Sequence, residues 1–242
     1  MSKRTRSLAV CALVLFCWVG NSTRAQFVSR QEITGATRLE NVRVEAQGIE
    51  AFFSDLSLSN DIPVGLEVAS GENEFTKYQV EFKAGTLSEL LTQFTARYSQ
   101  YTWAIKDGVV NVFPKESHRD ALSRELLEVK VAKAVVNKGM SCWTLTQSLA
   151  ASPEIKTILE ANSTGFRSRN FTGAYIPQLG RDFKLDISDA TLKSILNKVI
   201  KESPTAKFWV MTRDTNDRTV FFTLNARHED LPPIKIAPVL SQ

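Results

Sequence analysis

The chain has 242 residues with 43% hydrophobic content, and its formal net charge is +4. Four of its 30 basic residues and none of its 26 acidic residues lie in the first 25 positions, so residues 26–242 are formally neutral. Nucleic-acid binding needs a basic surface, and this composition therefore argues against a nucleic-acid partner. Cys11 and Cys17 also lie in that first segment, and the remaining Cys142 cannot form an internal disulfide.

Residues 1–25 have the pattern of a secretory signal peptide. A basic start at residues 3–6 precedes an apolar run over residues 8–20, and small residues lead up to Ala25. The run is short for a membrane span, so we expect cleavage before Gln26, with an uncleaved anchor as the alternative. The sequence therefore predicts a periplasmic or secreted protein that has no membrane span once the signal is cut.

Residues 39–115 are predicted to form a small α+β unit in the order β-α-β-β-α-β-β. Thr86 and Glu89 have the spacing of a capping box, and Asp107-Gly108 is typical of a hairpin turn. Apolar periodicity places strands at residues 41–45, 64–68, 78–83, 101–105 and 109–113, and helices at residues 49–56 and 87–98.

Residues 126–224 are predicted to form a second, similar unit, in which residues 126–136 are the opening strand. Adding 105 to the apolar positions of residues 80–94 gives apolar positions again, and Thr86 maps onto Thr191. Trp103 maps onto Trp209 at an offset of 106, and both rings are expected in the core, an exposed ligand platform being the alternative. We interpret the pattern as a tandem duplication, with the helices on one face of each small mixed sheet. The alternative is a chance likeness between two amphipathic units.

Three further segments are predicted from composition. Residues 115–124 are charged and favour a linker, and residues 225–242 contain three prolines and favour an extended tail. Residues 162–181 form an insertion within the second unit that has no counterpart in the first. The insertion supplies the candidate partner-binding residues, whose alternative role is packing on their own sheet: Phe166, Arg167, Arg169, Phe171 and Tyr175.

Residues 48–113 resemble the short N-terminal domain of bacterial secretins and TonB-dependent receptors, the STN domain. The matching motifs are Phe52-Phe53-Ser54-Asp55-Leu56, Asn60-Asp61-Ile62-Pro63-Val64, Thr86-Leu87-Ser88-Glu89-Leu90-Leu91 and the closing strand that ends at Phe113. Residues 185–224 are similar to half of this domain. The family carries it as a periplasmic docking module ahead of a β-barrel or ring-forming domain. Since the chain has no room for either, the resemblance implies docking in a bacterial envelope without pore or transport activity.

The inventory of chemically active residues is small. His118 and His228 have no catalytic motif around them, and their spacing with Cys142 does not fit a metal site. Cys142 shares a helical face with Leu145 and Leu149, which predicts a buried structural thiol. No catalytic, cofactor-binding or metal-binding residue is therefore predicted.

These features favour a non-catalytic periplasmic protein-interaction module, accessory to a secretin-like or TonB-linked system. Its envelope partner is expected to dock on an exposed sheet edge or on residues 162–181. The alternative is an exported enzyme of another class with a site near Cys142 or His118.

Overall fold

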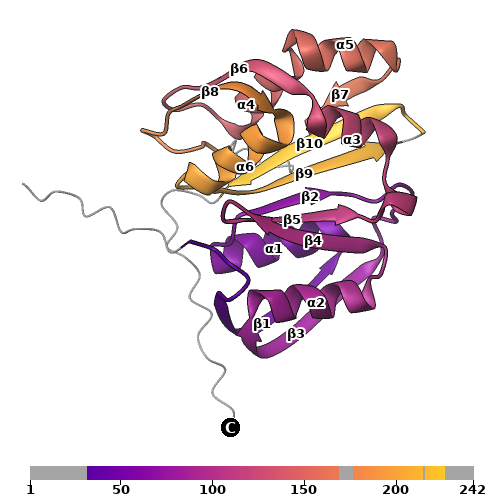
Figure 1. Ribbon diagram of the computed structural model, residues 1–242, viewed down its shortest axis with the longest axis vertical. Coiled ribbons are helices and arrows are strands. Elements are labelled where there is room, and N and C mark those ends of the chain that lie inside the picture. Colours follow the sequence, from indigo (N-terminus) through magenta and orange to yellow (C-terminus); the bar gives the residue numbers. More distant parts are fainter. Residues whose placement is uncertain (1–31, 169–176, 215, 227–242) are drawn as a thin grey trace, which may run out of the picture. The chain divides into compact units, whose positions relative to one another are not determined.

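The computed structural model describes residues 32–168, 177–214 and 216–226, and these belong to one compact unit (Figure 1). The first half contains β1 (Arg38–Gln47), α1 (Ile49–Asn60), β2 (Val64–Glu67), β3 (Lys77–Thr86), α2 (Leu87–Arg97), β4 (Tyr101–Lys106) and β5 (Val109–Pro114). A 3-10 turn, η1 (Glu116–His118), follows. The second half contains α3 (Ala121–Glu128), β6 (Lys130–Val136), α4 (Cys142–Ala150), α5 (Pro153–Ala161), β7 (Gly165–Arg167), β8 (Leu185–Thr191), α6 (Leu192–Glu202), β9 (Ala206–Asp214) and β10 (Thr219–Ala226). The predicted α+β class is confirmed.

A six-stranded sheet joins the two halves in the order β4-β5-β2-β9-β10-β7. Its centre is the parallel pair β2–β9, in which Val64 lies opposite Phe208 and Glu67 opposite Met211. Two antiparallel pairs, β1–β3 and β6–β8, lie apart from this sheet. The strands at the join come from both halves, which therefore share this sheet.

Two cores cover opposite faces of the six-stranded sheet. Along β9, Phe208 and Val210 belong to the core of α1 and α2, whereas Trp209 and Met211 belong to the core of α3, α4 and α6. This alternation is that of a central strand buried on both faces. Figure 1 shows β1–β3 beyond α1 and α2, and β6–β8 beyond α6 and α4. Helices α1, α2, α4 and α6 thus lie between two sheets. The shared six-stranded sheet and the two separate strand pairs differ from the expectation of one small mixed sheet per unit.

The strand pairings recur in the two halves. In the first, β5 pairs parallel with β2 and antiparallel with β4; in the second, β10 pairs parallel with β7 and antiparallel with β9. Thr86 and Thr191 both cap the helix that follows, and each side-chain oxygen accepts a backbone N–H three residues later. The strand-then-helix conformation is therefore common to residues 80–94 and 185–199, while descent from one duplicated unit stays a prediction.

The connection between the halves differs from the predicted linker and opening strand. Residues 121–128 are helix α3, because Asp120 accepts the Ser123 N–H as an N-cap and three leucines face the core at helical spacing. The strand begins only at Lys130. Ahead of α3, the N–H of Ser70 donates to the His118 carbonyl, so residues 115–124 form an ordered connection.

Trp209 is the side chain on which the join depends. It is 1% exposed, and its indole covers Gly65 on the neighbouring strand β2. The indole N–H donates to Asn197 Oδ1 at 2.8 Å, and Asn197 Nδ2 donates to Asn111 Oδ1 at 3.0 Å. This chain of hydrogen bonds links α6, β9 and β5, which come from both halves. Trp103, by contrast, is half-buried and packs against the core of α1 and α2.

Candidate functional site

The structure places two of the five predicted partner-binding residues on the edge strand β7. Phe166 is half-buried, with its ring centroid 6.4 Å from that of Phe222, so part of its apolar surface is used within the fold. Arg167 is exposed. Arg169, Phe171 and Tyr175 lie outside the described residues.

Parts of the predicted insertion are integrated into the fold. β7 pairs parallel with β10 as β2 does with β5, and it therefore provides the counterpart that the sequence analysis did not find. Gln178 and Leu179 are held through their carbonyl groups, which accept hydrogen bonds from Thr205 Oγ1 and Ser203 Oγ at 2.6 Å each. The described parts of segment 162–181 are thus not simply an addition to the surface.

The structure does not assemble a catalytic site from Cys142 and His118. Cys142 is 3% exposed, and burial raises the pKa of its thiol to about 12, so the thiol is protonated at neutral pH and is a poor nucleophile. His118 lies on the exposed turn η1, and its imidazole forms no hydrogen bond with another described residue. The site proposed for the alternative enzyme therefore has no geometric support in the described residues.

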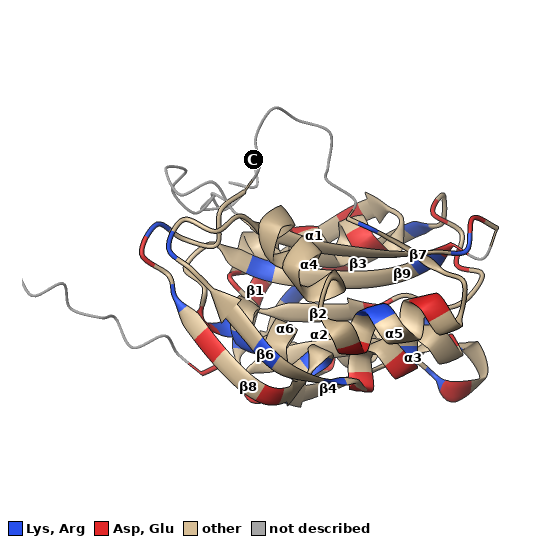
Figure 2. Cartoon of the chain, turned by 90° about the horizontal axis from the view of Figure 1, so that it is seen from above, with Lys and Arg blue, Asp and Glu red and all other residues tan. Residues whose placement is uncertain are grey.

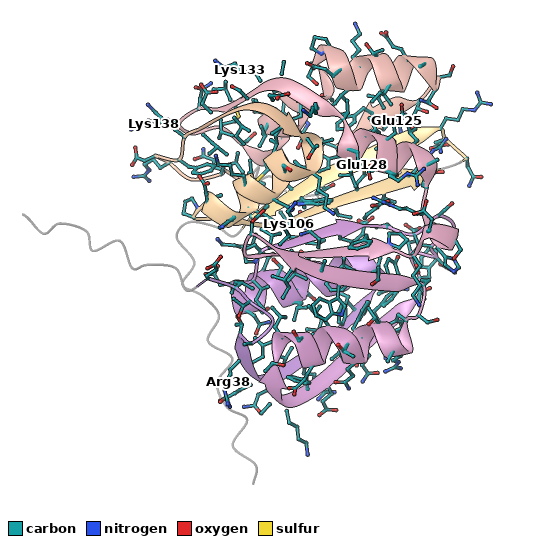
Figure 3. The ribbon with its side chains drawn as sticks, viewed as in Figure 1. Arg38, Lys106, Glu125, Glu128, Lys133 and Lys138 are labelled. Carbon is teal, nitrogen blue, oxygen red and sulfur yellow. The ribbon has the colours of Figure 1, made fainter. Side chains whose placement is uncertain are left out.

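A buried ion pair is part of the packing between the halves. Glu67 on β2 is 2% exposed and accepts two hydrogen bonds of 2.8 Å from the Arg119 guanidinium. Arg119 is also 3.8 Å from Glu128, which Figure 3 shows on α3. Beside it, Arg213 donates to Asp120 at 2.7 Å. Since the carboxylate of Glu67 is occupied by Arg119, this cluster is structural.

A second polar cluster fixes the turn before β3. Tyr78 and Tyr101 donate hydrogen bonds to the two oxygens of Glu72, at 2.5 and 2.9 Å. The Tyr101 hydroxyl also accepts the N–H of Ala69. Burial, followed by the bonds to Glu72, raises the pKa of Tyr78, and burial also raises that of Tyr101. These hydrogen bonds tie the turn to β3 and β4.

An open strand edge is the feature best suited to binding. Glu45 on β1 lies opposite Gln79 on β3. On the side of β3 that faces away from β1, the Gln79 N–H donates to the Tyr98 hydroxyl and the Gln79 carbonyl accepts from the Arg97 guanidinium. In an antiparallel pair such residues are not bonded to each other, so the N–H and C=O of Glu45 also point outward. The same alternation applies to Arg43. No described residue bonds to these backbone groups of β1.

Two other strand edges, those of β3 and β6, are partly covered. The outer edge of β3 carries the contacts from Tyr98 and Arg97. On β6, which occupies the position of β1 in the second half, Glu154 of helix α5 accepts the N–H of Ala132 at 3.0 Å. Edge strand β4 presents outward backbone groups at Trp103 and Ile105 by the same alternation, but neither of the two hollows described below lies along it.

A hollow of about 180 Å³ runs between the β1 edge and helix α1. Residues 42–45 form its strand side, and Asp55, Ser59 and Asn60 form its helix side. Partial burial raises the pKa of Asp55, and no described residue pairs with its carboxylate. A further hollow, of about 260 Å³, lies between β3 and α2, along the edge that Arg97 already occupies. Only the first hollow combines an open strand edge with an unpaired charge.

The sequence predicts strand 41–45 and the helix that carries Asp55, but not the site that they form. Asp55 and Ser59 lie four residues apart on the polar side of α1, a spacing that is also typical of any solvated helix face. No local pattern indicates which strand edge stays open, because that depends on the packing of α2 and α5.

Surface charge and residue composition add little to the identification of a functional site. Figure 2 shows basic and acidic residues interspersed along β6, β8, α3 and α5. In the part of the chain that the structure describes, no cluster of His, Cys, Asp and Glu could hold a metal ion, and no helix is long and apolar enough to span a membrane. Comparisons with protein-family models, curated proteins and solved structures find no match.

Proposed function

We propose that the chain is an exported, non-catalytic protein-interaction module of the bacterial envelope, accessory to a secretin-like or TonB-linked system. The observation that carries this proposal is the open edge of β1 beside the hollow against α1. An open edge offers a row of backbone donors and acceptors to an extended segment of a partner, and a neighbouring groove receives its alternate side chains. The edge therefore binds protein through backbone pairing.

Two further observations support the proposal. The STN resemblance of residues 48–113 implies periplasmic docking, and the open edge lies in this half of the chain. The buried thiol of Cys142 and the solvated His118 do not offer the paired nucleophile and base that hydrolytic chemistry uses.

Capture of a partner tests the proposal. Residues 26–242 are immobilised and exposed to envelope extracts of the organism that produces the chain, beside the variants Glu45→Pro and Glu45→Gln. Proline removes the outward N–H of residue 45 while the inward ladder bonds of its neighbours stay, whereas glutamine keeps that N–H. We expect the unchanged chain and Glu45→Gln to retain a partner that Glu45→Pro loses. Failure of the folded, unchanged chain to retain any protein would count against the function.

Export is tested separately. N-terminal sequencing of the exported form should find Gln26 as the first residue, since a basic start, an apolar run and small residues precede it. A mature chain that begins at Met1 or Ser2 would show that the signal assignment is wrong.

The predicted partner-binding residues of the second half form an alternative docking surface. Replacing Arg167, Phe171 and Tyr175 by alanine should leave the fold intact and weaken binding of the captured partner by at least about 1 kcal/mol if this surface is used. Unchanged affinity would leave the β1 edge as the docking surface.

A further inference from the structure

We propose that the β1 edge selects extended segments that carry a lysine or arginine on the side facing α1. This inference rests on the proposed function, since it names the chemistry of the partner segment that the same edge accepts. Its basis is the position of one acidic side chain, Asp55, on the helix side of the hollow, where the other lining residues are neutral; Arg43 and Glu45 line the strand side.

The register of β1 determines which side chains of an added strand face the helix. Successive side chains of a strand point to opposite faces of a sheet. Along β1, Val42 and Val44 are buried towards α1, and Arg43 and Glu45 are exposed on the other face. A strand paired with β1 therefore directs every second side chain into the space between β1 and α1.

Asp55 is the charged group on the helix side of that space. Ser59 and Asn60 beside it are neutral, and Asn60 Nδ2 is already bonded to the Leu56 carbonyl. Burial is the cause of the raised pKa of Asp55, and Arg43 on the strand side of the hollow does not offset it. A basic side chain from a bound strand would supply the missing counter-charge, while an acidic one would be repelled.

The opposite face of the added strand is less selective. Glu45 is already paired with Lys77, whose Nζ lies 2.6 Å from Glu45 Oε1, and both side chains are largely exposed. Charge pairs in such exposed positions contribute little to affinity. The sign of the residue next to Asp55 is therefore the main determinant of which strand binds.

The corresponding edge of the second half does not compete for such a segment. There the carboxylate of Glu154 is bonded to the N–H of Ala132, so a carboxylate occupies the strand edge itself. Glu154 lies in the first turn of α5, and its pKa is lowered by backbone N–H groups of Glu154 and Ala132. One site per chain is expected.

Two synthetic peptides test the inference. Both are fluorescein-labelled alternating Thr-Val octapeptides, with a central valine replaced by lysine in one and by glutamate in the other, and binding to residues 26–242 is measured by fluorescence anisotropy at low salt. We expect the lysine peptide to bind about tenfold more tightly, because attraction replaces repulsion at a partly desolvated carboxylate. Raising the salt concentration should reduce the preference.

Variants of Asp55 show whether this residue causes the preference for the lysine peptide. Asp55→Asn should abolish it, and Asp55→Lys should reverse it in favour of the glutamate peptide. The matched control is Asp186→Asn, which removes an exposed strand carboxylate in the second half and should leave the preference unchanged. Because Asp55 is exposed, none of these changes disturbs the core.

The outcomes separate this inference from the function on which it rests. Equal binding of both peptides, or a preference that survives Asp55→Asn, overturns the inference, although capture of an envelope partner that depends on the edge would still support the function. Binding of neither peptide also overturns it. Concentration-dependent self-association that Glu45→Pro abolishes would identify a second copy as the occupant and overturn it too. A reversal with Asp55→Lys, without self-association, supports it.

Discussion

Replacing Gly65 by alanine should destabilise the protein at the join between its halves. The added Cβ would lie 2.3 Å from Cε2 and 2.5 Å from Nε1 of Trp209, against an ordinary contact of at least 3.4 Å. β2 cannot withdraw, because it is hydrogen-bonded on both sides, to β5 and to β9. The indole would have to move by about 1 Å and strain its hydrogen bond to Asn197.

The expected loss follows from these contacts. Overpacking of a rigid core costs about 1–3 kcal/mol, and weakening the bond of a buried indole N–H adds about 1 kcal/mol. Without the clash, alanine in a strand would instead stabilise by about 0.5–1 kcal/mol relative to glycine. The net effect expected of Gly65→Ala is a free energy of unfolding lower by about 2 kcal/mol, which corresponds to a melting temperature lower by roughly 4–8 °C.

A double-mutant cycle tests the cause. Urea unfolding is measured for the unchanged chain, Gly65→Ala, Trp209→Phe and the double variant. The smaller phenylalanine ring should accommodate the methyl group, so Gly65→Ala should cost less than about 1 kcal/mol in that background. If the two changes are additive, or if Gly65→Ala alone is neutral, the packing argument is wrong.

Three further outcomes are expected. Arg119→Ala should cost about 3–5 kcal/mol in urea unfolding, because it leaves the buried carboxylate of Glu67 unpaired, whereas Arg119→Ala combined with Glu67→Leu should recover much of this loss. Burial raises the pKa values of Tyr78 and Tyr101 above the unfolded value of about 10, so their contribution to stability should be present below about pH 10 and be lost as the pH rises above it. Tyrosinate absorbance from these two residues that appears near pH 10 while the fold is intact would contradict this. Cys142 in residues 26–242 should react with iodoacetamide only after unfolding, and rapid labelling of the native chain at pH 8 would show that its thiol is accessible.

The predicted elements were accurate where the signal was local. Strand alternation and the helical stripe of residues 80–94 depend on neighbouring positions only, and their counterparts at residues 185–199 were found in the same way. Helix α3 carried a local signal as well, in the Asp120 cap and the leucine spacing after it, but its charged residues were interpreted as a linker.

Long-range pairing could not be predicted. The four residues of β2 are compatible with several partners, and their placement between β5 and β9 depends on the space that Gly65 leaves for Trp209. β7 is only three residues long and was not recognised as a strand. Which strand edges are covered depends on where α2 and α5 pack. No pattern within residues 38–47 therefore shows that the edge of β1 stays open.

The pairing of β2 with β9 also raises the question of whether further copies could extend the six-stranded sheet. β2 and β9 occupy different places in their respective halves, so their pairing is head-to-tail, and a contact of this kind repeated between copies would give an open-ended fibre. The terminal strand β4 lacks the apolar side chains that such growth would bury. On β9, Phe208 and Val210 pack into the core of α1 and α2. The corresponding residues of β4 are Thr102 and Ala104, and β4 ends at Lys106 (Figure 3). A lysine and small residues at a terminal strand oppose addition of another sheet, so polymerisation is disfavoured at this end.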